Sequence, residues 1–317
     1  MCSTRSPEEE SYEFFEKIEE FIKKAKSAES TTSLSEDENG CNSFMQSSER
    51  YITDKETART ICKQFIELYE SLTDLKSKNE NDHNYIKCSK FLNYWVNFKL
   101  SENMKNDDDS VRDVYNAIES QITGSDGHDI FLCFIYDINK DDLYRMNILY
   151  NLYDKYIKLK NIIEDTSEPN KQSLLNLSTA CCPDYIKASY MCNNDNKNNN
   201  PIFCNKLTTF KSKYDALYKK AFQEGSDYAN NFIKLEECSN NKIITTAVTG
   251  TVVGLIPLFG VLYKFTPMGQ MFRSKMGILN NNISNNEEDM TNMSLMEQEN
   301  EPLRFKQGTY NIKYQSL

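Results

Sequence analysis

The chain has few residues of the kinds that perform catalysis near neutral pH. Its two histidines, His83 in NDHNY and His128 in SDGHD, match no zinc-protease, catalytic-triad or phosphohydrolase pattern. We expect both on the surface. The chain also has no glycine-rich loop of the kind that cradles phosphates. We therefore expect no catalytic residue and no cofactor.

A short acidic stretch, DINKDD, begins like a calcium-binding loop, with oxygen ligands at Asp137, Asn139 and Asp141. The pattern then fails, because its sixth position is Asp142 instead of glycine and its twelfth is Ile148 instead of glutamate. We therefore expect no metal site here.

Ten cysteines are the most distinctive reactive groups of the chain. They stand at positions 2, 41, 62, 88, 133, 181, 182, 192, 204 and 238, and none follows residue 242. This distribution favours an oxidising environment for the first part of the chain, and a reduced domain with many structural thiols is the alternative. Zinc ligation is disfavoured because no CxxC pair occurs and histidines are scarce. We expect a few disulfides whose pairing the sequence does not reveal.

Four of these cysteines, at 181, 182, 192 and 204, surround the asparagine-rich stretch from Asn193 to Asn200. We expect disulfides there to close loops and hold this stretch in shape. Cys238 would then fasten the last helix before residue 242.

Apolar residues recur at helical spacing through most of the first 242 residues. The clearest stripe runs from Ala58 to Leu75, preceded by Thr53 and Glu56 in a capping-box arrangement. Further stripes run from Phe14 to Ala25, Tyr85 to Phe98, Val111 to Ile122, Leu149 to Ile163, and Leu207 to Ala221 with an extension toward Leu235. The apolar run from Ile130 to Tyr136 fits a buried strand or a buried helix, and we favour a helix because an isolated strand would be unusual.

An uncharged run of 21 residues, Ile243 to Tyr263, lies between two lysines. At about 1.5 Å per residue its helix would be ~30 Å long, which matches the hydrocarbon core of a lipid bilayer. The run therefore predicts one transmembrane helix. Basic residues follow it without a nearby acid, so the positive-inside rule predicts a cytoplasmic tail. The start of the chain lacks the pattern of a cleavable signal peptide, so we expect the run itself to direct insertion.

Within this run, Gly250 and Gly254 form a GTVVG motif. Small residues at this spacing permit two membrane helices to approach closely, so the motif predicts a homodimer face. Ordinary membrane-helix composition is the alternative reading.

The predicted fold class is all-α. It comprises a cysteine-containing helical ectodomain over residues 1–242, one C-terminal transmembrane helix over 243–263, and a short disordered cytoplasmic tail over 264–317. The tail has equal numbers of basic and acidic residues, so the formal charge of −10 belongs to residues 1–242. That charge argues against nucleic acid as a partner of the ectodomain.

The stretch from Gly250 to Lys275, GTVVGLIPLFGVLYKFTPMGQMFRSK, resembles the membrane and juxtamembrane segment of the Plasmodium interspersed repeat (PIR) family, in particular its vivax branch, the VIR proteins. The LYKFTPxG element is the most specific part. The aromatic-rich stripe around Trp95 and the CCP at Cys181 to Pro183 are also similar. The resemblance implies a variant antigen of blood-stage malaria parasites with a helical ectodomain. For such antigens it implies roles in antigenic variation, immune evasion and adhesion to host receptors.

We therefore expect a non-enzymatic, single-pass variant surface antigen that contacts a host receptor or antibody through its exposed loops. Its N-terminal part would lie outside, on the infected erythrocyte or another parasite-derived membrane. The alternative is an internal membrane component that organises trafficking or membrane structures in the infected cell. An unrecognised enzyme is a third hypothesis.

Overall fold

Helices make up nearly all of the regular structure in the part of the chain that the computed structural model describes, residues 10–30, 39–106, 109–126, 130, 132–164, 171–193 and 200–239. The α-helices are α1 (Ile18–Ser30), α2 (Asn39–Ser47), α3 (Lys55–Ser71), α4 (His83–Asn103), α5 (Val111–Asp126), α6 (Lys140–Glu164), α7 (Lys171–Met191), α8 (Pro201–Glu224) and α9 (Ser226–Asn230). Short 3-10 helices are η1 (Glu13–Lys17), η2 (Ser48–Arg50), η3 (Thr73–Ser77) and η5 (Leu235–Ser239). The predicted all-α character is confirmed for these residues.

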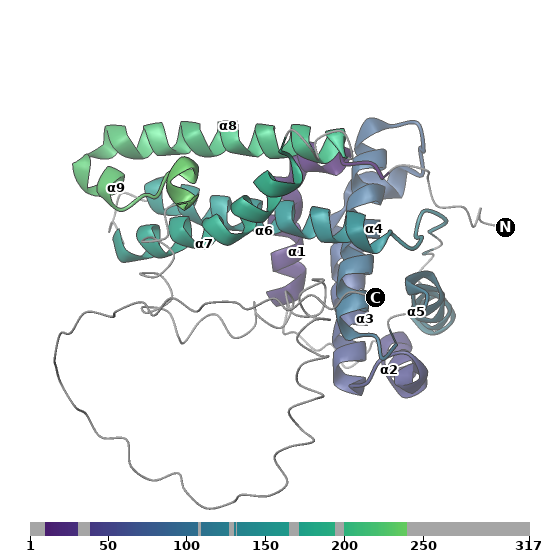
Figure 1. Cartoon of the computed structure of the whole chain (residues 1–317). Helices are drawn as coiled ribbons and strands as arrows, with labels where there is room; N and C mark the ends of the chain where they lie inside the picture. Colours follow the sequence, from purple (N-terminus) through teal and green to yellow (C-terminus); the bar gives the residue numbers. More distant parts are fainter. Residues whose placement is uncertain are drawn as a thin grey trace, which may run out of the picture. The chain divides into compact units, whose positions relative to one another are not determined.

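The helices form two groups (Figure 1). In the first group α6 contacts both α7 and α8, the three helices lie side by side, and η5 packs against α7. In the second group α2 packs against α3 and α5, and α4 contacts the same two helices. Helix α1 joins the groups because it contacts both α3 and α6.

Aromatic side chains fill much of the core between these helices. Phe21 of α1 stacks on Phe91 of α4 with ring centroids 4.6 Å apart. Tyr153 of α6 and Phe210 of α8 meet edge to face at 5.2 Å. Both pairs are buried, as is Trp95 of α4. Such pairs contribute roughly 0.5–1.5 kcal/mol each beyond the burial of their area, so they help to fix how the helices cross.

The predicted transmembrane helix finds no support, and the fold class is corrected on this point. Among the described residues no helix combines the length and apolarity that a bilayer crossing needs. Helix α6 is the longest described, at 25 residues, but charged side chains such as Asp142, Lys155 and Lys160 interrupt it. The predicted span at 243–263 and the predicted tail at 264–317 lie outside the described residues.

The helix that we expected to continue from α8 toward Leu235 is also wrong. Gly225 ends α8 with a φ of 137°, a backbone conformation that residues with a side chain rarely adopt. After it the chain folds back along α8. Phe232 packs edge to face on Tyr214 at 5.0 Å, and the Tyr214 hydroxyl donates a hydrogen bond to the Ile233 carbonyl oxygen at 2.8 Å.

The described residues of the apolar run from Ile130 to Tyr136 form neither a helix nor a strand. Two buried asparagines of α4 bind this segment instead. Asn93 accepts a hydrogen bond from the Tyr136 N–H at 3.0 Å, and Asn97 accepts one from the Ile138 N–H at 2.9 Å. The Asn97 amide also donates to the Tyr136 carbonyl oxygen at 2.9 Å. Side-chain amides thus satisfy the backbone groups that a helix or sheet would otherwise pair.

The start of α3 differs by one residue from the predicted capping box. The helix is capped by Asp54, whose carboxylate accepts a hydrogen bond from the Thr57 N–H at 2.9 Å, rather than by Thr53. Carboxylates are among the preferred N-cap groups, so the type of cap is as expected although the residue is not.

Candidate functional site

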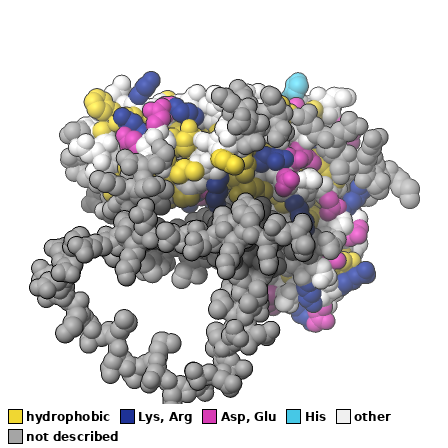
Figure 2. Space-filling model, in the orientation of Figure 1, with side chains coloured by type: hydrophobic (Ala, Val, Ile, Leu, Met, Phe, Trp, Pro, Cys, Tyr) yellow, Lys and Arg dark blue, Asp and Glu magenta, His cyan; other side chains and the backbone are white. Residues whose placement is uncertain are grey.

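One face of α7 carries apolar side chains toward solvent. Ile186 is 37% exposed, Tyr190 is 71% exposed, and Pro183 on the same side is also exposed. Spacings of three and four residues place these side chains on one side of the helix. We call these three residues the α7 contact surface. Figure 2 shows hydrophobic side chains reaching the molecular surface over the layer of α6, α7 and α8, among lysine and acidic side chains.

The α7 contact surface has no negative charge, although the chain carries a formal charge of −10. The one acid in α7 is Asp184, which is 4% exposed and points into the protein. Its carboxylate accepts a hydrogen bond from the Lys155 ammonium of α6 at 2.6 Å. Each of these buried charges compensates the other, because either alone would be costly to remove from water. The acid therefore helps to position α7 and leaves no acidic side chain of this helix on the outer face.

Small side chains on the opposite face hold α7 close to its neighbours. Ser178, Cys181, Cys182 and Ala188 are each at most 1% exposed. The Ser178 hydroxyl oxygen accepts a hydrogen bond from the Ile233 N–H at 3.1 Å, which links α7 to the segment before η5. We did not predict α7 as a helix because its buried face lacks a stripe of large apolar residues. The recurrence of small residues at helical spacing is the signal that indicates it.

A disulfide between Cys192 and Cys204 ties the end of α7 to the first turn of α8. It closes the connection that contains the asparagine-rich stretch, as predicted. The start of α8 is fixed further by Asn200, whose side-chain oxygen accepts a hydrogen bond from the Phe203 N–H at 3.0 Å. Tyr190 therefore stands two residues before a connection that is anchored at both ends.

Disulfides also fasten other helices. The described pairs are Cys41–Cys62, Cys182–Cys238 and Cys192–Cys204. The bond at Cys238 joins η5 to α7, which confirms the predicted role of this cysteine. Cys181 does not join the predicted group of disulfides, since it is a buried free thiol like Cys88. Burial raises the pKa of each free thiol to about 12, so both stay protonated and unreactive near neutral pH.

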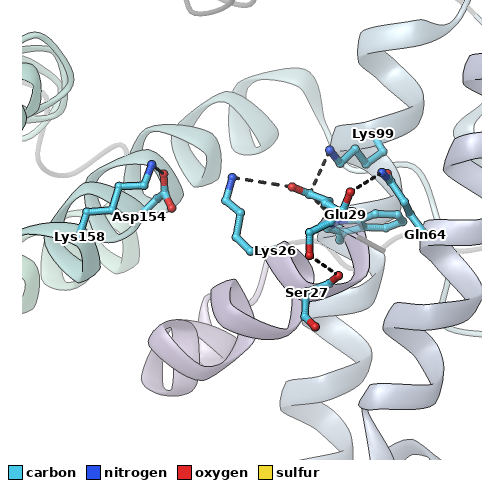
Figure 3. Close-up of polar contacts among 9 residues, drawn as sticks. Lys26, Ser27, Glu29, Gln64, Lys99, Asp154 and Lys158 are labelled. Atoms are coloured by element: carbon cyan, nitrogen blue, oxygen red, sulfur yellow. Dashed lines mark hydrogen bonds and ion pairs between the residues drawn. The ribbon is translucent and has the colours of Figure 1, made fainter. Parts of the chain in front are cut away.

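A polar cluster at the end of α1 ties three helices together. Glu29 lies between Lys26 and Lys99, with its carboxylate 3.7 and 3.0 Å from their ammonium nitrogens (Figure 3). The Trp95 indole N–H donates to the same carboxylate at 3.4 Å, and the Gln64 amide donates to the Glu29 carbonyl oxygen at 3.5 Å. These contacts link α1 to α3 and α4. A carboxylate whose charge is balanced by two ammonium groups is suited to holding helices together.

A second polar cluster lies where the described chain begins. Glu10 is 7% exposed, and its carboxylate accepts a hydrogen bond from the Tyr136 hydroxyl at 2.8 Å. The Lys90 ammonium donates to the same hydroxyl at 3.1 Å. Burial raises the pKa of the Glu10 carboxyl, although the Tyr136 hydrogen bond and the Lys90 charge act in the opposite direction. This cluster holds the residues before η1 against α4.

The residues that began like a calcium loop serve as helix caps. The Asp137 carboxylate accepts hydrogen bonds from the Ser110 hydroxyl at 2.7 Å and the Val111 N–H at 2.6 Å, at the start of α5. The Asn139 side-chain oxygen accepts one from the Asp141 N–H at 2.9 Å, at the start of α6. Within the described ranges no three His, Cys, Asp or Glu side chains are grouped so that they would hold a metal ion.

The remaining predicted site residues are placed as follows. His83 is exposed at the first residue of α4, as expected for a surface histidine. His128 lies outside the described residues, as do the predicted dimer-face residues Gly250 and Gly254. The middle of the asparagine-rich stretch, 194–199, also lies outside them.

Comparison with known proteins bears on the C-terminal part of the chain. A family model described as Plasmodium vivax Vir protein matches residues 219–317, a region that begins near the end of α8 and includes Cys238. No curated protein and no solved structure matches the chain. The match confirms the resemblance predicted from the sequence: residues 219–317 are similar to the Plasmodium Vir family.

Proposed function

We propose that the chain is a non-enzymatic surface antigen whose helical part presents the α7 contact surface to a host receptor or to antibodies. In this proposal the surface serves adhesion to the host, and differences at this surface between family members serve antigenic variation and immune evasion. The match to the Vir family supports the antigen part of the proposal.

The observation that carries the proposal is the exposure of Tyr190 and Ile186 beside a disulfide-closed connection. Tyrosine is enriched among the residues that dominate binding energy at protein interfaces, because it combines a large apolar ring with a polar hydroxyl. A helix that is pinned by buried side chains holds such a residue in place before the partner arrives. Less conformational entropy is then lost on binding.

The proposal assigns the chain no reaction. This part of the proposal is supported by the structural role of the described polar clusters. Glu29, Asp184 and Glu10 each accept contacts that join separate segments of the chain. Turnover of any substrate by the purified full-length chain in an unbiased activity screen would contradict this part of the proposal.

Surface display is tested by an epitope inserted between Asn193 and Asn200 in the full-length chain. Intact infected cells are compared with permeabilised ones for antibody access and for protease sensitivity. We expect a signal on intact cells that external protease removes. A signal that is found only after permeabilisation would contradict surface display.

The contact surface itself is tested with the double variant Ile186→Ala, Tyr190→Ala. The matched control is Phe222→Ala, which removes another exposed ring, 64% exposed, from α8. Phe222 lies 18 residues beyond Cys204, or ~27 Å along α8 from the disulfide that borders Tyr190.

We expect the double variant to weaken binding of immune antibodies or of a captured host receptor by about tenfold or more, the scale of a lost hot-spot side chain. The Phe222 control should leave binding unchanged. Equal binding by all three proteins would refute the assignment of this surface.

A further inference from the structure

The three described disulfides differ in how far they are shielded from solvent. Cys41, Cys62, Cys182 and Cys238 are each at most 1% exposed. In the third pair Cys204 is 4% exposed, but Cys192, the first residue after α7, is only partly buried. The disulfide that borders the α7 contact surface is therefore the least shielded of the three.

We propose that the Cys192–Cys204 disulfide is a redox-sensitive bond that an external dithiol opens while the two buried disulfides stay closed. Its opening regulates the contact surface, because Tyr190 lies two residues before Cys192. The regulatory part rests on the proposed function, whereas the selective chemistry does not.

The reaction is a thiol–disulfide exchange with balanced atoms and electrons. A thiolate of the dithiol attacks the sulfur of the partly buried Cys192, and the Cys204 thiolate leaves and takes a proton from water. The second thiolate of the reagent then attacks the mixed disulfide and releases the Cys192 thiolate, which is also protonated. The protein disulfide gains two electrons and two protons, and the reagent becomes a disulfide.

The fold around this bond tolerates its opening. Helix α8 keeps its Asn200 cap and its Pro201 start, and Phe203 in the same turn is fully buried. Helix α7 keeps the Cys182–Cys238 disulfide and the Lys155–Asp184 ion pair, and its own members of these pairs, Cys182 and Asp184, come before Tyr190. Opening therefore loosens the last turn of α7, where Tyr190 stands, and leaves both helices anchored.

The selective chemistry is tested on the oxidised full-length chain. The folded protein is exposed to increasing dithiothreitol or to reduced thioredoxin, new thiols are alkylated, and each cysteine is followed by mass spectrometry. We expect Cys192 and Cys204 to be alkylated about tenfold faster than the cysteines of the buried pairs, because those open only with larger unfolding. Circular dichroism at that stage should show unchanged helix content.

Cys133 is followed separately in this experiment, because it is exposed and also disulfide-bonded. Its alkylation is read from its own peptide and does not enter the comparison. In denaturant the order of reduction should disappear, because burial no longer distinguishes the pairs. Reduction of all three described pairs at one rate in the folded protein would overturn the proposal.

Regulation is tested by measuring binding of an antibody to the contact surface before and after selective reduction. A change of about tenfold is expected, and the variant Cys192→Ala, Cys204→Ala should show the same change without reductant. Selective reduction with unchanged binding would overturn the regulatory part. Failure of the contact surface itself is seen separately, in oxidised protein, when Ile186→Ala, Tyr190→Ala has no effect.

Discussion

Removal of single disulfides gives the sharpest test of how the helices around α7 are held. The two disulfides of this region close very different lengths of chain, with a sequence separation of 56 for Cys182–Cys238 and of 12 for Cys192–Cys204. We predict that replacing both cysteines of the longer loop by alanine destabilises the protein more than the same change in the shorter loop.

The magnitude follows from the entropy that each bond removes from the unfolded chain. On the loop-closure relation, the longer loop is worth about 4 kcal/mol and the shorter about 3 kcal/mol, a difference of about 1.3 kcal/mol. Loss of buried sulfur contacts acts in the same direction. Cys182 and Cys238 are both 1% exposed, whereas Cys192 is only partly buried, so its removal leaves less unfilled space.

The assay is urea unfolding of the oxidised full-length variants, followed by the helical circular dichroism signal. The free energy of unfolding is compared at equal slopes, so that both variants expose the same surface. The third pair, Cys41–Cys62, serves as an internal reference, because its separation of 21 places it about 0.5 kcal/mol above the shortest loop. A Cys192–Cys204 variant that loses as much stability as the Cys182–Cys238 variant would refute this reasoning.

Three further predictions concern buried polar groups and one turn. Lys155→Met alone should lower the free energy of unfolding by about 3–5 kcal/mol, because it leaves the Asp184 carboxylate buried without its partner. Adding Asp184→Leu should recover most of that loss in thermal or urea unfolding. If the double variant recovers no stability, the ion-pair account is contradicted. Because burial raises the folded-state pKa of Glu10 above the ordinary value of 4.5, its contribution to stability is present below that value and is lost as pH rises through the folded pKa. Glu10→Gln should therefore flatten the pH dependence of the melting temperature above pH 4.5 and leave stability at pH 7 equal or higher, and a steeper dependence would refute it. Gly225→Ala should destabilise the protein by about 1–2 kcal/mol, since alanine is strained at a φ of 137°, and an unchanged unfolding midpoint would show that this turn readily relaxes.

Large apolar residues made part of the fold predictable. The stripe around Phe65 of α3 and that around Tyr153 of α6 lie on helices whose large side chains are buried, so periodicity indicated them directly. Helix α7 was not predicted because its buried face consists of small residues such as Ser178 and Ala188, which do not form a stripe of large apolar side chains in the sequence. The apolar run from Ile130 to Tyr136 was wrongly predicted to be a helix. Its backbone groups bind side chains of α4, which lie far away in the sequence.

The candidate contact surface was less predictable than the fold. Sequence placed the cysteines around the asparagine-rich stretch and correctly suggested that disulfides would close it. Exposure of Tyr190 was not readable, because an aromatic residue in a helix is more often buried, and only the packing of α7 on α6 decides which face turns outward. The absence of an acidic side chain from that face likewise depends on Asp184 being turned toward Lys155.

The disulfide between η5 and α7 has a mechanical consequence. The described chain leaves this region at Ser239, one residue after Cys238. A pulling force applied to the chain beyond that point passes through the sulfur bridge to Cys182, in the middle of α7. The force does not peel η5 and α9 away one contact at a time. It must instead shear α7 against α6, where many side chains resist together, so this covalent link sets the path by which tension on the C-terminal side enters the domain.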